Sequence, residues 1–294
     1  MNVFIFGPQR SGSTLLFNLI SKHNSVLSTP NDLNILGFFN KKQNKSIIKN
    51  LKTYWGIEEI PEYDNKSDFL LKILKLYFNK NLDNKFKEII LHKVPKGEFS
   101  YSTYRKVLPE SKYIFLLRNP ISIMASRKYW GNSNPNFSIW NDILPQTANF
   151  DNLHTSFKYM QRHLDDIFRS FVMADLKIDN KSTLKVLSYE DLIDNAGIVL
   201  TNICELLELS TDYVNSAVSS IEDPYTSYSS LSDRIGIYTD SLGMWANKLT
   251  AMEQSLILNE LKKFYYDHGF KSEIIKTYIK EYINNIEEVM KSLM

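Results

Sequence analysis

The order of apolar and polar residues along the chain predicts alternating strands and helices. Residues 2–6 are mostly apolar, Gly7 follows, and apolar residues then recur with helical spacing up to position 20. Further apolar runs of strand length are EIILHK at 88–93, KYIFLL at 112–117 and LKVLSY at 184–189. Segments of helical periodicity separate these runs, which is typical of a parallel α/β sheet.

Three longer stretches are expected to add helices to this sheet. Residues 33–86 and 131–180 are too long for simple connections, and we interpret them as helical excursions that cover the sheet edge. Residues 250–294 predict two amphipathic helices broken near DHGFKS, where Gly269 fits a helix stop. A length of 294 residues suits one domain with insertions, so we expect a single α/β domain over residues 1–294.

Composition and charge exclude several classes of protein. The 35 basic and 33 acidic residues leave a net charge of +2, so no overall field favours nucleic acid or a membrane surface as a partner. Cys204 is the one cysteine, which excludes an internal disulfide and a cysteine-rich metal cluster. After Met1 the sequence continues with NVFIFG rather than a leader, and no apolar run reaches bilayer length, so we expect a cytoplasmic protein.

The segment GPQRSGST at 7–14 resembles a phosphate-binding loop that lacks its usual lysine. Ser13 stands where a nucleotide triphosphatase carries that lysine, and the basic residue is Arg10 instead. Backbone N–H groups at a helix start still converge on an anion. The loop therefore suits a phosphate better than a magnesium-bound triphosphate, although a plain turn with a helix cap is the simpler alternative.

A second candidate anion site lies in YIFLLRNPISIMASRKYW, residues 113–130. Arg118 ends a predicted strand, Pro120 opens the next helix, and Ser126 follows two turns along it. Ligands of doubly wound sheets gather at such strand ends. An arginine and a serine at a helix start can bracket a phosphate, and they can also act only as caps.

Together, these two motifs resemble the PAPS-dependent sulfotransferases, where PAPS is 3′-phosphoadenosine 5′-phosphosulfate. PQRSGSTLL is similar to the family's 5′-phosphosulfate loop, and LLRNPISIMASRKYW to its 3′-phosphate motif. LHKVPKGEF and VLSYEDLIDNAGIVLTNICELLEL are similar to two further family segments, so the likeness spans most of residues 1–210. The resemblance implies a P-loop-like sulfotransferase architecture, PAPS as donor, PAP as the nucleotide product, and no metal.

The resemblance also implies roles for individual residues. Arg10 and Lys93 would stabilise the charge that develops on the leaving phosphate. Tyr189 would lie against the adenine, with a core tyrosine as the alternative, and Ser232 with Arg234 match a late 3′-phosphate loop only loosely. The full donor set is Arg10, Ser11, Gly12, Ser13, Thr14, Arg118, Ser126, Tyr189, Ser232 and Arg234.

The general base is open between two residues. Asp32 lies beyond the first helix, near the place of the family's carboxylate, although Asn31 is closer to the expected register. His92 neighbours Lys93, but strand alternation points these two side chains to opposite faces of the sheet. We favour Asp32 as the base that accepts the proton of the acceptor.

The predicted function is transfer of a sulfonate group from PAPS to a hydroxyl or amine of a soluble small molecule, a metabolite or natural product. Two alternatives remain. A P-loop kinase would need magnesium, for which VLSYED holds the one acidic candidate at a strand end. A catalytically silent nucleotide-binding module would show no turnover. The sequence does not indicate the acceptor or the oligomeric state.

Overall fold

The computed structural model describes residues 1–29, 51–52, 57–59, 61–81, 88–95, 101–133, 150–177, 183–219 and 243–292. Their centre is a five-stranded sheet in the order β2-β3-β1-β4-β5, in which every pair of neighbours is parallel. Parallel strands present their carboxyl ends at one edge, where the loops of an α/β protein bind ligands. The strands are β1 (Asn2–Gly7), β2 (Val26–Ser28), β3 (Ile89–Pro95), β4 (Lys112–Leu117) and β5 (Leu184–Ser188).

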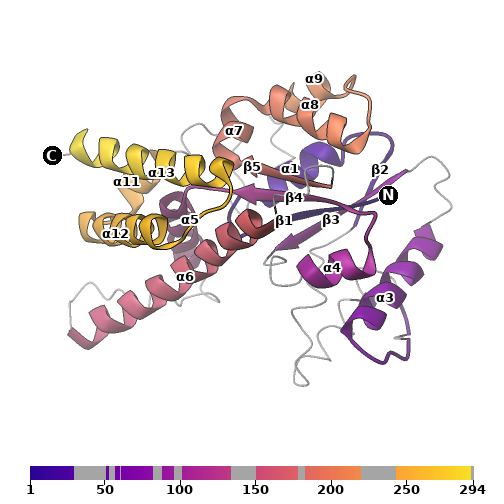
Figure 1. The fold of residues 1–294 in the computed structure, drawn as a ribbon, viewed down its shortest axis with the longest axis horizontal. Coiled ribbons are helices and arrows are strands. Elements are labelled where there is room, and N and C mark those ends of the chain that lie inside the picture. The colour runs from indigo at the N-terminus through magenta and orange to yellow at the C-terminus, as the bar shows by residue number, and fades with distance from the viewer. Residues whose placement is uncertain are drawn as a thin grey trace.

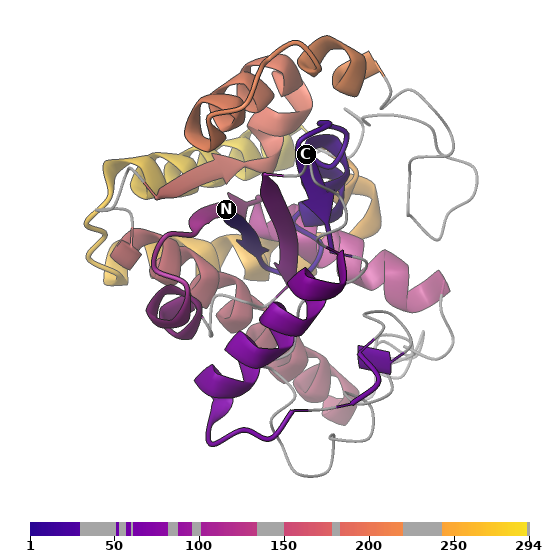
Figure 2. The same cartoon turned by 90° about the vertical axis from the view of Figure 1, so that its right-hand side faces the viewer.

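Helices cover both faces of the sheet and form a three-layer α/β/α arrangement (Figure 1). One face packs against α1 (Ser13–Ile20), α7 (Tyr189–Asp194), α8 (Ala196–Leu207) and α9 (Val214–Ser219). The other face packs against α3 (Lys66–Asn81), α4 (Tyr101–Val107), α5 (Pro120–Ser133), α6 (Phe150–Lys177), α11 (Trp245–Lys248), α12 (Ala251–Asp267) and α13 (Glu273–Ser292). Figure 2 shows the same separation from the side, with α8 and α9 above the sheet and α3 below it.

Strand alternation divides the core into two apolar layers. In β1, Val3 and Ile5 face the α1 layer, while Phe4 and Phe6 face the layer of α3 to α6. Strand β4 alternates in the same way. Ile114 faces the α1 layer, and Tyr113 faces the layer of α3 to α6. These strands are buried on both faces, which explains why they were visible as continuous apolar runs.

The predicted fold class is confirmed, with differences at single elements. Strand β2 was not predicted, because its three residues are too few to show a period. The break in the C-terminal region lies where expected, but Gly269 has no positive φ and a Cβ there would meet nothing within 4 Å. Instead, the Asp175 carboxylate of α6 accepts hydrogen bonds from the backbone of Lys271 and Ser272 and fixes the start of α13.

The two predicted excursions contain α3 and α6 in the part of the chain that the structure describes. Among those described residues, no helix is both long enough and apolar enough to cross a membrane.

Candidate active site

The loop between β1 and α1 has a backbone that its sequence explains. Gly12 has φ 92°, a conformation that glycine adopts without strain, and it precedes the first turn of α1. A side chain on Gly12 would overlap the ring of Tyr189, and one on Gly7 would meet Leu116 and Ser11. Both glycines are therefore required by close packing, and the N–H groups at the start of α1 point toward the loop.

Lys93 connects strand β3 to this loop. Its Nζ donates to Thr14 Oγ1 at 2.8 Å, from the face of β3 that packs against α1. This places a cation beside the first turn of α1. An ammonium and a helix N-terminus both favour a bound anion.

Arg10 joins the two predicted anion motifs. Its Nε donates to Ser126 Oγ of α5 at 3.0 Å, and Arg118 Nη1 donates to the Arg10 carbonyl at 2.9 Å. Desolvation and then the charge of Arg118 lower the pKa of Arg10 from its ordinary value. Two guanidinium groups held this close repel each other, and a bound anion between them would relieve that repulsion.

Tyr189 lies against both motifs. The guanidinium carbon of Arg118 is 4.0 Å from the centre of the Tyr189 ring, and the same ring packs on Gly12. Such stacking fixes a planar guanidinium in one orientation. Arg118 and Tyr189 are both buried.

His92 lies in the opposite layer from Lys93, as strand alternation predicted. Its ring is fully buried and stacks on Phe4 with centroids 4.6 Å apart, and Nε2 lies 3.1 Å from Asn2 Oδ1. Burial lowers the pKa of His92 to about 3. A general base must reach the proton of the acceptor, so this position argues against His92 as the base.

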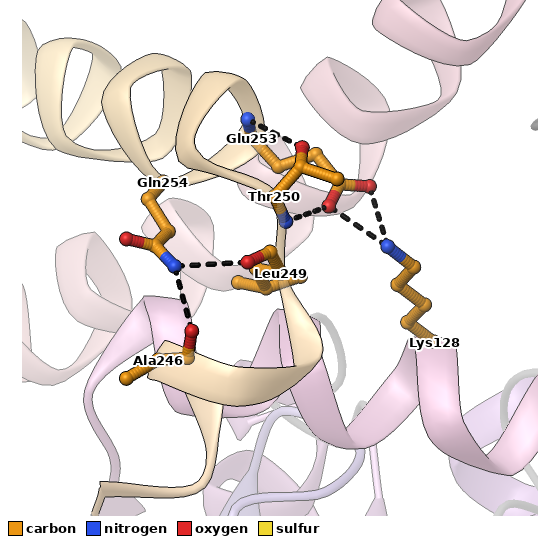
Figure 3. Close-up of polar contacts among 6 residues, drawn as sticks. All are labelled: Lys128, Ala246, Leu249, Thr250, Glu253 and Gln254. Atoms are coloured by element: carbon orange, nitrogen blue, oxygen red, sulfur yellow. Dashed lines mark hydrogen bonds and ion pairs between the residues drawn. The ribbon is translucent and has the colours of Figure 1, made fainter.

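Helix α5 is fixed directly after Ser126 by two residues that the sequence did not single out. Arg127 is buried, and its Nη1 donates to His163 Nδ1 of α6 at 2.8 Å. Lys128 Nζ forms an ion pair with both oxygens of Glu253, which also completes the capping box of α12 with Thr250 (Figure 3). The sequence signal that could have identified Arg127 and Lys128 is their position directly after Ser126.

Glu190 is a further residue that the sequence did not single out. Its segment VLSYED was named only as the acidic candidate of the kinase alternative and as part of a stretch similar to the family. Its carboxylate accepts hydrogen bonds from Asn119 N, Ser188 Oγ and the Tyr282 hydroxyl. No sequence signal joined it to Tyr282, which lies 92 positions away.

Three predicted site residues, Asp32, Ser232 and Arg234, lie outside the described residues. Among the residues that are described, no group of three or more His, Cys, Asp or Glu side chains is arranged to hold a metal ion. The described geometry therefore concerns the remaining residues, which are those expected to bind the nucleotide donor.

The comparisons with known proteins agree with this geometry. The glycine loop between β1 and α1 and the arginine that follows β4 belong to a parallel sheet of an α/β protein. Residues 2–213 match the model of the sulfotransferase family, and the chain belongs to that family. No curated protein sequence matches the chain significantly.

Solved structures share the fold at low sequence identity. The sulfotransferase domain of the Synechococcus PCC 7002 olefin synthase matches with TM-score 0.55 and 17% identity, over 91% of this chain and 96% of that one. The sulfotransferase domain of the curacin biosynthetic pathway matches with TM-score 0.52 and 15% identity, over 88% and 96%. Retinol dehydratase, solved with androsterone and the inactive cofactor PAP, matches with TM-score 0.51 and 14% identity, over 92% and 82%.

The residues present fit a nucleotide with two separate anionic groups. Thr14 and Lys93 lie at the start of α1, while Arg118 and Ser126 are each hydrogen-bonded to Arg10 of the loop. The Tyr189 ring beside them offers an aromatic face. Cations, hydroxyls and an aromatic surface are the donor set that such a ligand needs.

Proposed function

We propose that this protein transfers a sulfonate group from PAPS to a hydroxyl or amine of a small soluble acceptor. The observation that carries the proposal is the hydrogen bond from Arg10 to Ser126, because it joins the loop and the α5 corner into one cationic cluster. Retinol dehydratase has been solved with PAP and androsterone, which supports a nucleotide and a small molecule as the ligands here.

In this proposal, the donor supplies an activated sulfonate whose bond to the 5′ phosphate is broken. The loop with the start of α1 binds the 5′ end, Arg118 with Ser126 binds the 3′ phosphate, and Tyr189 stacks on the base. Ser232 and Arg234 are proposed to add to the 3′ contacts. The acceptor oxygen or nitrogen attacks sulfur, and the bridging oxygen leaves with the electron pair of the broken bond.

Lys93 and Arg10 act on the charge that grows on the leaving oxygen. A cation that interacts more strongly with the transition state than with the ground state raises kcat rather than donor affinity. Lys93 reaches the loop through Thr14 and therefore lies close to the 5′ end of a bound donor. We assign no step to a metal.

The test is a screen of small alcohols and amines with PAPS, followed by mass spectrometry for an added sulfonate. The screen is run in EDTA and again with magnesium and ATP in place of PAPS. We expect sulfonated product in EDTA and no phosphorylated product with ATP. Phosphorylation instead would establish the kinase alternative, and PAP binding without any turnover would indicate a silent binding module.

We propose Asp32 as the general base that takes the proton of the acceptor. A positioned base contributes about 10² to 10⁴ in rate, so Asp32→Asn should lower the single-turnover rate at least about a hundredfold while PAP affinity stays unchanged. His92→Gln is the matched variant and should be the milder one. Near wild-type rates for Asp32→Asn would remove Asp32 from this role.

A further inference from the structure

The Glu190 carboxylate ties together three elements at the donor corner. One oxygen accepts the backbone N–H of Asn119 at 3.0 Å, and the other accepts Ser188 Oγ at 2.9 Å and the Tyr282 hydroxyl at 3.1 Å. Asn119 follows β4, Ser188 ends β5, and Tyr282 belongs to α13. Helix α13 lies beyond residue 213, where the family match ends.

These bonds lie directly beside the stacked pair of the donor site. Asn119 is the residue after Arg118, and Glu190 is the residue after Tyr189. The carboxylate therefore joins the backbones that carry the Arg118 guanidinium and the Tyr189 ring, which lie 4.0 Å apart. The Tyr189 ring in turn packs on Gly12 of the loop.

The hydroxyl of Tyr282 is suited to hold this carboxylate in place. Tyr282 is buried, and burial together with the Glu190 charge raises its pKa well above the ordinary value. The phenol thus keeps its proton at neutral pH and donates a hydrogen bond to the carboxylate. A hydrogen bond to a charged group is stronger than one between neutral groups.

The charge of Glu190 has the wrong sign for contact with the ligand. A carboxylate close to an anion site repels the anion, so simple electrostatics predicts that its removal would tighten nucleotide binding. Its three hydrogen bonds engage both carboxylate oxygens and connect three separate elements, which is the pattern of a group that orients other groups.

We propose that Glu190 is a positioning residue for the donor site, and that Tyr282 of α13 holds it in its working orientation. The inference rests on the proposed function, because it concerns the site at which the nucleotide binds. It adds the C-terminal helix to that site through the hydrogen bond from Tyr282 to Glu190.

The molecule contains an internal control for this proposal. The Tyr278 hydroxyl, one helical turn before Tyr282, donates to Asp191 Oδ2 at 3.0 Å. The two tyrosine rings lie 6.4 Å apart with nearly parallel planes, Tyr282 buried and Tyr278 half-buried. Both bonds join α13 to α7, but only that of Tyr282 continues through Glu190 to Asn119.

The experiment compares Tyr282→Phe with Tyr278→Phe. Each variant loses one hydroxyl and keeps its ring, so we expect similar falls in melting temperature. Tyr282→Phe should weaken PAP binding about threefold to tenfold in calorimetry and raise the KM for PAPS, with the KM for the acceptor unchanged. Tyr278→Phe should bind PAP like the wild type.

Two variants of Glu190 complete the series. Glu190→Ala should weaken PAP binding at least about tenfold, whereas Glu190→Gln should be milder because its amide oxygen can still accept from Asn119. PAP binding equal to or tighter than wild type in Glu190→Ala would overturn the proposal, as would equal losses in the two tyrosine variants. If Glu190→Ala does not fold, the tyrosine pair decides.

Failure of the inference can be told apart from failure of the proposed function. A wild-type protein that does not bind PAP would contradict the proposed function before any variant is compared. A wild type that binds PAP, with Tyr282→Phe and Glu190→Gln both unchanged, would contradict only the role of Glu190 and Tyr282.

Discussion

His92 and Arg118 each lie against an aromatic ring, yet their surroundings lead to opposite charge states. His92 stacks on Phe4 in the layer beneath the sheet, where Tyr104 and Tyr113 surround the same phenylalanine. Arg118 stacks on Tyr189 at the carboxyl edge of the sheet. Burial removes the proton of the imidazole, while a guanidinium remains charged under all physiological conditions.

The difference shows why a nitrogen-bearing side chain beside a ring is not by itself a functional signal. Around His92, the polar side chain of Asn2 lies at the edge of an apolar layer. Around Arg118, a backbone carbonyl of a strained loop and a second arginine come together. A side chain that stays charged at the end of a strand indicates a ligand site. A side chain that burial makes neutral inside an apolar layer indicates packing.

The largest expected effect tests the charged region through Lys93. Lys93→Ala should lower kcat about a hundredfold and change PAP affinity much less, because the lysine is assigned to the leaving group. Lys112→Ala is the control, since Lys112 begins β4 at the opposite edge of the sheet. Full turnover at saturating PAPS with weakened binding in Lys93→Ala would show that the lysine only binds the donor.

Arg118 sharpens the same contrast at the nucleotide. A hydrogen bond to a charged group contributes about 1.5 to 3 kcal/mol, so Arg118→Ala should weaken PAP binding at least about tenfold. Calorimetric titration of PAP measures the effect. An unchanged affinity would place the 3′ phosphate elsewhere.

Gly12 tests whether the packing of Tyr189 against the loop is required. Gly12→Ala puts a side chain at φ 92° and into the Tyr189 ring, and should destabilise the fold by about 1 to 3 kcal/mol and weaken PAP binding. Gly269→Ala is the matched control, because nothing lies within 4 Å of its added Cβ. Denaturant midpoints of both variants provide the comparison, and equal midpoints would contradict it.

His92 tests the buried region through pH. The folded state keeps His92 neutral down to about pH 3, whereas the unfolded chain binds a proton below about pH 6.5. The free energy of unfolding should therefore fall by up to about 1.4 kcal/mol per pH unit as the pH drops below that value. His92→Gln should lose this contribution, so that urea midpoints at pH 7 and pH 5 differ less than in the wild type. An identical pH dependence in both proteins would mean that His92 is not the source.

Much of the fold could be predicted because the apolar runs of the strands are buried on both faces. The period of two also separated His92 from Lys93 correctly. Strand β2 could not be found in this way, since three residues pair only because β3 lies beside them. The end of α12 was predicted from Gly269, while the structure explains the start of α13 through Asp175, a contact between residues 96 positions apart.

The residues proposed to bind the donor could be predicted from the sequence where they belong to short motifs. Arg10, Thr14, Arg118 and Ser126 belong to two such segments, and the structure brings the segments together. Their roles toward PAPS remain predictions. Glu190 and Tyr282 could not be paired from sequence, because a hydrogen bond between distant segments leaves no local pattern.

Arg10 has φ 74°, in the left-handed region that costs a residue with a side chain about 1 to 2 kcal/mol. Glycine would adopt this backbone without strain. A glycine at position 10 would therefore raise thermal stability but remove the guanidinium that reaches Ser126. A laboratory evolution experiment that selects for heat resistance alone should enrich glycine there. Selection for sulfonate transfer should restore arginine. The proteins from the two selections would then differ at position 10.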